Sequence, residues 1–177
     1  IPTAIIGFLA YKIIKLYLFN PIAVAIALIL GGIIIIVIDR KMIEKKSTYP
    51  NLENISYTNA FFVGLIQCLS MIPGVSRAAA TIIGGVYNGF DKKQATEFSF
   101  LLAIPTMLAA TGYELLKTPV VFTSDHVFKL GLGAVIAFAT AWIAVKLFLK
   151  IIDQYGFKYF GYYRIVLGVI FLLIVVL

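Results

Sequence analysis

The chain has 177 residues, of which 62% are hydrophobic and only 13% are charged. Soluble domains carry about 25% charged residues, so a water-soluble domain of this size could not hide so much apolar surface, and a bilayer is the expected solvent. The formal net charge is +7. The basic residues gather at the ends of apolar runs and form no stripe interleaved with aromatic residues, which argues against nucleic acid as a partner.

Six apolar blocks follow one another along the chain and predict an all-α, polytopic integral membrane protein. The second block has 18 residues without a charge, which is the usual length of a spanning helix. We expect about five spanning helices plus one re-entrant helical hairpin, within a single transmembrane domain over 1–177. The blocks cover residues 1–19, 21–38, 57–90, 95–116, 127–149 and 160–177.

The third block, residues 57–90, is too long for one crossing. Its 34 residues would measure about 51 Å as a continuous helix, whereas the hydrocarbon core is about 30 Å thick. Pro73 and Gly74 divide it into halves of 16 residues, each about 24 Å long. We therefore predict a re-entrant hairpin over about 57–90, and two thin full crossings remain the alternative.

Either arrangement of the third block returns the chain to the same face, so the basic residues can orient the protein. If the polar loop 39–56 lies inside, the basic residues outside are only Lys12, Lys15, Lys117 and Lys129. Those inside are Arg40, Lys41, Lys45, Lys46, Lys92, Lys93, Lys146, Lys150 and Lys158. The positive-inside rule favours this orientation, which leaves the predicted site open to the outer face. Arg77 and Arg164 lie within apolar blocks and are not counted.

The break in the third block has the features of an anion site. Pro73 cannot donate a backbone hydrogen bond, and Gly74 permits backbone angles that other residues avoid. Ser76 is a natural N-cap for the helix that follows. The free N–H groups of a helix N-terminus, together with an arginine fork, suit a phosphate. Because a charged arginine near the bilayer centre costs at least about 2.5–3.5 kcal/mol, Arg77 is a functional candidate.

A structural role for Arg77 remains the alternative, since its guanidinium could bond backbone carbonyls, pair with Glu97 or reach toward one face. Gln67, about two turns before Gly74, could face the same cavity or bond between helices. Cys68 is the only cysteine, so no disulfide is possible within the chain, and no zinc site is expected. Close helix packing is predicted at Gly31, Gly32, Gly84, Gly85, Gly131 and Gly133.

The residues around the break resemble a known family. Pro73-Gly74-Val75-Ser76-Arg77 with Thr81 is similar to the PGxSRSxxT motif of the undecaprenyl-pyrophosphate phosphatases, the BacA/UppP family. Residues 97–105, EFSFLLAIP, are similar to the EFSFLLAxP run of that family, and the likeness spans the whole chain. There are two departures. Ala78 replaces the second serine of the motif, and nothing in 1–177 matches the family's acidic EGxTEFLPVSSTGH stretch.

The resemblance implies a membrane phosphatase that converts undecaprenyl diphosphate into undecaprenyl phosphate and phosphate. Such an enzyme recycles the lipid carrier for peptidoglycan and cell-wall synthesis, and so bears on cell shape and bacitracin resistance. The expected catalytic residues are Arg77 and Ser76. The expected substrate-binding residues are Gly74, Val75, Ala78, Thr81 and Gln67. A divalent cation, Mg²⁺ or Ca²⁺, is implied as well, but its ligands would belong to the acidic stretch, so no metal ligand is assigned here.

The chain is therefore expected to be the C-terminal portion of an enzyme of the bacterial inner membrane. Its expected substrate is a polyprenyl diphosphate, and a homodimer is an open alternative to a monomer. A polyprenyl-phosphate transporter or flippase is the rival, because transporters also place anion sites between repeats near the middle of the membrane. An inactive fragment of the enzyme is the third alternative. His126, the only histidine, is placed in an outer loop and is given no role.

Overall fold

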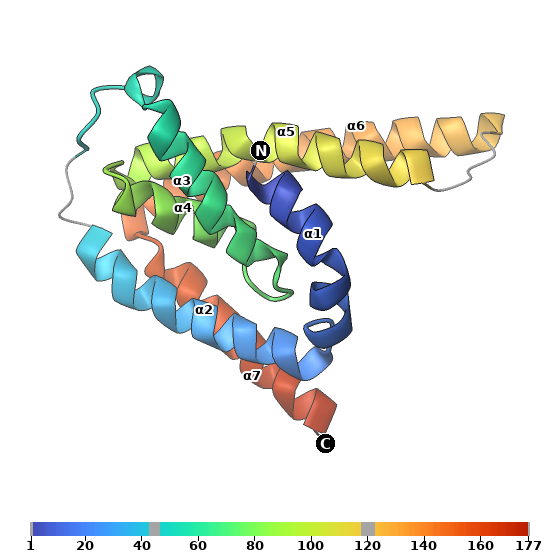
Figure 1. Cartoon of the computed structure of the whole chain (residues 1–177), viewed down its shortest axis with the longest axis horizontal. Helices are drawn as coiled ribbons and strands as arrows, with labels where there is room; N and C mark the ends of the chain where they lie inside the picture. Colours follow the sequence, from blue (N-terminus) through green and yellow to red (C-terminus); the bar gives the residue numbers. More distant parts are fainter. Residues whose placement is uncertain (1, 43–46, 118–122, 177) are drawn as a thin grey trace.

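The computed structural model describes residues 2–42, 47–117 and 123–176, and within them it contains helices and no strand, which confirms the all-α prediction (Figure 1). The α-helices are α1 (Pro2–Tyr17), α2 (Pro21–Met42), α3 (Tyr57–Gln67), α4 (Arg77–Tyr87), α5 (Lys92–Lys117), α6 (Ser124–Tyr155) and α7 (Lys158–Val176). Two short 3-10 helices, Leu52–Asn54 and Cys68–Met71, lie before and after α3.

Four helices of the described chain, α2, α5, α6 and α7, are long and apolar enough to cross a membrane. The described α1 has 16 residues and measures about 24 Å, a little less than the hydrocarbon core. By contrast, α3 and α4 have 11 residues each, about 16 Å, so neither can cross alone. The chain is thus a multi-pass membrane protein whose third apolar block folds differently from the others.

The antiparallel helices α2 and α7 make the most extensive helix contact in the described chain (Figure 1). Glycines let the two backbones approach closely, as small residues do between membrane helices. A Cβ added to Gly32 would lie 2.6 Å from the carbonyl oxygen of Gly161, and one added to Gly168 would lie 3.0 Å from that of Ala25. At one end of the pair, the buried carboxylate of Asp39 accepts a hydrogen bond from the backbone N–H just before α7, with N and O 2.6 Å apart.

The helices α3 and α4 pack against each other as a helical hairpin, and residues 68–76 form its tip (Figure 1). The two ends of the hairpin lie together, because the Asn59 side-chain amide donates to the carbonyl of Asn88 at 3.3 Å. The helices are shorter than the predicted halves of 16 residues, since the chain leaves the α-helical conformation between Cys68 and Ser76. Re-entry of this hairpin into the membrane stays a prediction.

The apolar core lies at the base of the hairpin, where it joins α2, α3, α4, α5 and the end of α6. Its members include Ile35, Val63, Ile82, Phe90, Ile152 and Phe157. The first turns of α5 and the last turns of α6 meet at this end, whereas the helices' other ends, with Lys117 and Lys129, lie far from the hairpin base (Figure 1). Lys92, Lys93 and Lys150 line one pocket at this end, and the charge count predicts that these three lysines lie on the same side of the membrane. Lys45 and Lys46 lie outside the described residues.

Candidate anion site at the hairpin tip

The tip of the hairpin rests on α2 through a glycine. Gly74 has φ +91°, in the region that favours glycine. A Cβ on this residue would lie 2.6 Å from the carbonyl oxygen of Val24, so no side chain fits. The N–H of Val75 donates to the carbonyl of Ile72 at 3.0 Å and closes the turn. The predicted substrate-binding residues Gly74 and Val75 therefore shape the loop, and the Val75 N–H is already engaged.

The helix that follows the break begins where the sequence predicts. Ser76 has an extended backbone (φ −70°, ψ 125°), and its hydroxyl oxygen accepts a hydrogen bond from the Ala79 N–H at 3.2 Å. The first turn of a helix has N–H groups without partners inside the helix, and here those of Arg77 and Ala78 begin α4. The N-terminus of α4 thus offers donors and a partial positive charge beside a guanidinium.

The Arg77 and Gln67 side chains carry buried polar atoms without partners. Within the described residues, Arg77 Nη1 and Gln67 Oε1 have no hydrogen-bond partner, and Gln67 is only 2% exposed. Buried polar groups are almost always paired. Arg77 Nη1 is a donor, so a bound anion could satisfy it, whereas Gln67 Oε1 is an acceptor and would need a donor. No ion pair joins Arg77 to Glu97 in the described chain, which removes one structural alternative for the arginine.

The hydroxyl of Thr81 ties the first turn of α4 to α5. Thr81 Oγ1 lies 2.9 Å from the Arg77 carbonyl oxygen and 2.6 Å from Ser99 Oγ, and both hydroxyl side chains are buried. A threonine hydroxyl has one proton; if Thr81 donates it to the carbonyl, Ser99 must donate to Thr81. The Thr81 hydroxyl is therefore engaged within the protein, which favours support of Arg77 over direct contact with a phosphate.

A second buried arginine, Arg164 of α7, reaches the tip and has no role in the sequence prediction. Its Nη2 donates to the carbonyl of Gly74 at 2.6 Å and to that of Ala27 at 3.3 Å. The signal that singles out Arg77, an arginine inside an apolar block, is present at Arg164 as well. What the sequence does not show is the contact with Gly74, a residue 90 positions away along the chain.

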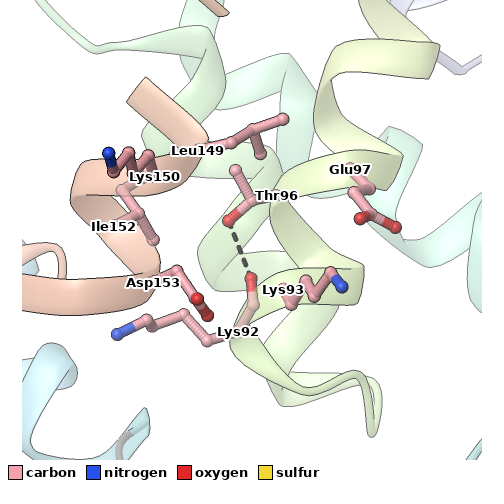
Figure 2. Close-up of a pocket in the computed structure, with 8 residues that line it drawn as sticks. All are labelled: Lys92, Lys93, Thr96, Glu97, Leu149, Lys150, Ile152 and Asp153. Atoms are coloured by element: carbon pink, nitrogen blue, oxygen red, sulfur yellow. Dashed lines mark hydrogen bonds between the residues drawn. The ribbon is translucent and has the colours of Figure 1, made fainter. Parts of the chain in front are cut away.

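A pocket of about 260 Å³ lies apart from the tip, between the first turns of α5 and the last turns of α6 (Figure 2). None of the residues predicted for the site lines it. The Thr96 hydroxyl donates to the Lys92 carbonyl at 2.7 Å inside it. Its lining carries three lysines and two carboxylates: Lys92, Lys93, Thr96, Glu97, Leu149, Lys150, Ile152 and Asp153.

The described residues do not fit a divalent cation. They contain no group of three or more His, Cys, Asp or Glu side chains that could hold a metal ion. Residues 68–77 contain no carboxylate, the ligand a divalent cation prefers, and the guanidinium and backbone N–H groups at the tip attract anions. The cation implied by the family resemblance therefore has no ligands at the tip, and no step of the reaction is assigned to it.

Comparison with known proteins gives one family match and a set of similar curated proteins. A family model described as bacitracin resistance protein BacA matches residues 1–170. An undecaprenyl-diphosphatase from Wolinella succinogenes is 49% identical over 172 residues, covering 97% of this chain and 67% of that protein. Another from Persephonella marina is 49% identical over 175 residues, covering 99% and 68%. The undecaprenyl-diphosphatase 3 of Acinetobacter baylyi is 46% identical over 173 residues, covering 98% and 64%. The chain thus spans about two thirds of the length of these relatives.

Proposed function

Because the chain belongs to the bacitracin resistance protein BacA family, we propose that the protein hydrolyses undecaprenyl diphosphate to undecaprenyl phosphate and inorganic phosphate. The family predicted from the motif is confirmed, and the phosphatase class agrees with the names of the similar proteins. The activity is proposed for the whole protein, since this chain spans about two thirds of the relatives' length.

The observation that carries the proposal is the buried Nη1 of Arg77, which lies at the N-terminus of α4 and has no hydrogen-bond partner among the described residues. A diphosphate ester presents several negatively charged oxygens, which match a planar fork of N–H donors. The helix dipole and the first-turn N–H groups add to the attraction. A lipid substrate also accounts for a polar site within an apolar, membrane-embedded chain.

In the proposed reaction the oxygen of a water molecule bonds to the terminal phosphorus, the phosphoanhydride P–O bond breaks, and the lipid monophosphate leaves with its bonding electron pair as inorganic phosphate forms. Arg77 stabilises the charge that develops on the phosphate oxygens in the transition state, where such contacts have their largest effect. The Ser76 hydroxyl accepts from Ala79 N–H, which leaves its own proton for a phosphate oxygen. In the alternative route the Ser76 oxygen attacks the terminal phosphorus, its proton passes to water, the lipid monophosphate leaves, and a second water molecule hydrolyses the phosphoserine. In this proposal the backbone N–H groups of Arg77 and Ala78 bind phosphate oxygens, and the side-chain NH2 group of Gln67 donates to another.

For the location, we propose the bacterial inner membrane with the tip open to the outer face. The positive-inside rule supports this orientation, because the hairpin base lies at the end of the molecule that holds Lys92, Lys93 and Lys150. The substrate would then be a polyprenyl diphosphate presented from the outer leaflet. A divalent cation and a homodimer stay predictions.

Phosphate release by the purified full-length protein in liposomes tests this function against a flippase. We expect stoichiometric release of phosphate from undecaprenyl diphosphate, with undecaprenyl phosphate as the lipid product. Transfer of the intact diphosphate across the bilayer without phosphate release would support the flippase instead. Assay of residues 1–177 alone tests the third alternative. Activity equal to that of the full-length protein would show that no essential group lies outside them.

A further inference from the structure

The guanidinium of Arg164 occupies a space that a glycine of the neighbouring helix provides. Arg164 lies on α7 and is 4% exposed. A Cβ on Gly31 of α2 would lie 2.6 Å from Arg164 Nη2 and 3.3 Å from Cζ. Any side chain at position 31 would therefore displace the guanidinium. The α2–α7 contact is thus shaped around this one cation as well as around close backbone packing.

The donors of Arg164 are directed at backbone carbonyls of two other elements. Nη2 bonds the Gly74 carbonyl in the hairpin tip and the Ala27 carbonyl in α2. The Phe160 ring lies 5.9 Å from Cζ, within the range of a cation–π contact. No carboxylate pairs with Arg164 among the described residues, and its Nε has no partner there.

A buried, unpaired cation is an inefficient way to hold two helices together. Taking a charged side chain out of water costs several kcal/mol, and no carboxylate of the described chain offsets that cost for Arg164. The glycine-rich contact between α2 and α7 would persist without the charge. The particular contribution of Arg164 is the 2.6 Å bond to Gly74 O, which lies three residues before Arg77.

We propose that Arg164 is a positioning residue for the phosphatase site. It fixes the Gly74 carbonyl, and through the closed turn at Val75 and the Ser76 cap it sets where α4 begins and where Arg77 points. Arg164 acts through Arg77 and does not touch the substrate. This inference rests on the proposed function. A misplacement of about 1 Å in a catalytic group can lower the rate about 100-fold.

The test uses the full-length protein and two substitutions of Arg164. Arg164→Met keeps the apolar stem and removes the donors, and we expect kcat to fall about 100-fold. The melting temperature in detergent should change little, because the cost of leaving the Gly74 carbonyl unpaired opposes the gain from removing a buried charge. Arg164→Lys retains one charged donor and should recover part of kcat. Loss of kcat together with an equivalent loss of thermal stability would mean that Arg164 is only structural.

A double-mutant cycle with Arg77→Ala gives the readout that a structural role would not produce. If Arg164 acts through Arg77, Arg164→Met should lower kcat by less than about threefold once Arg77 is absent. Losses that multiply in the double variant would overturn the proposal. An inactive wild type would overturn the proposed function and the inference together, whereas an active wild type with fully active Arg164→Met would overturn the inference alone.

Two glycine variants keep the proposal testable if the Arg164 variants fail to fold. Gly31→Ala displaces the guanidinium but leaves it in the chain, whereas Gly168→Ala crowds the same helix pair against Ile29 and Ala25, away from Arg164. We expect kcat to fall at least about tenfold in Gly31→Ala and to stay near wild type in Gly168→Ala. Equal losses in both variants would contradict a specific role for Arg164.

Discussion

The hairpin tip and the α5–α6 pair differ in how tightly their surroundings fit. At the tip, a methyl group added to Gly74 would lie 2.6 Å from Val24 O, and on α2 beside the tip one added to Gly31 would lie 2.6 Å from Arg164 Nη2. In α5 and α6, a methyl added to Gly112, Gly131 or Gly133 would meet nothing within 4 Å. The close packing predicted for Gly131 and Gly133 is therefore wrong for the described chain, because α6 contacts little besides α5 there.

The charged side chains are at least partly buried beside the hairpin tip and exposed on α6. Two arginines lie beside the tip, Arg77 at the start of α4 and Arg164 on α7. Each has a buried guanidinium atom without a partner in the described chain, Nη1 in Arg77 and Nε in Arg164. On α6, Lys129 and Asp125 form an exposed pair one helical turn apart, with Nζ and Oδ2 2.5 Å apart. Lys146 lies over the Trp142 ring at 4.9 Å. Exposed pairs contribute little to stability, and α5 and α6 are long and apolar enough to span a membrane. The buried donors beside the tip are the ones that support the proposed diphosphate site.

Among the variants that keep Arg77 and Arg164, Gly74→Ala should have the largest effect, because it places a methyl group against Val24 O and strains a positive φ. We expect phosphate release to fall at least about 100-fold. Gly89→Ala is the matched control, since Gly89 has φ +96° and a Cβ there would lie 2.9 Å from Thr48 Oγ1, but it sits at the hairpin base. Equal losses of kcat in the two variants would remove the distinction between tip and base.

Gln67→Leu should have a smaller effect on activity. The Gln67 Oε1 atom has no partner in the described chain, so its replacement should change the melting temperature little. If the Gln67 NH2 group donates to the diphosphate, KM should rise about tenfold, as expected for one lost hydrogen bond to a charged group. An unchanged KM would leave Gln67 as a packing residue between helices.

Thr81→Val should act mainly on stability. It breaks the buried bond to Ser99 and leaves that hydroxyl unpaired, so unfolding in detergent should become easier by about 1–3 kcal/mol. The double variant with Ser99→Ala should lose less than the sum of the two single variants. Additive losses would mean that the two hydroxyls do not depend on each other.

Gly133→Ala should have the smallest effect, because nothing in the described chain surrounds the added methyl. Alanine in place of glycine favours a helix by about 1 kcal/mol, so the melting temperature should stay level or rise. Phosphate release should equal that of the wild type. A clear loss would show that this face of α6 is packed in the whole protein.

Local features of the tip could be predicted from the sequence because they depend on neighbouring residues. The N-cap at Ser76 follows from one side chain reaching the N–H three residues later. The break at Gly74 follows from the preceding proline and the freedom of glycine. The hairpin follows from the length of the apolar block compared with the bilayer.

Long-range contacts could not be predicted, because hydropathy and spacing describe only neighbours along the chain. Arg164 bonds a residue 90 positions away, and Asp39 bonds one 118 positions away. Both are visible in the sequence as charged residues in or beside apolar blocks, but nothing there names their partners. The same limit applies to the bond between Thr81 and Ser99, which needs α4 and α5 placed in space.

The most direct test of the central claim is phosphate release by full-length Arg77→Ala and Arg77→Lys variants, measured beside the wild type with melting temperatures as a check on folding. We predict a fall in kcat of about 100- to 1,000-fold for Arg77→Ala and a smaller fall for Arg77→Lys, which keeps the charge but loses the fork. Both variants should unfold at or near the wild-type temperature. An Arg77→Ala protein that is folded and releases phosphate at the wild-type rate would contradict a diphosphate site at the hairpin tip.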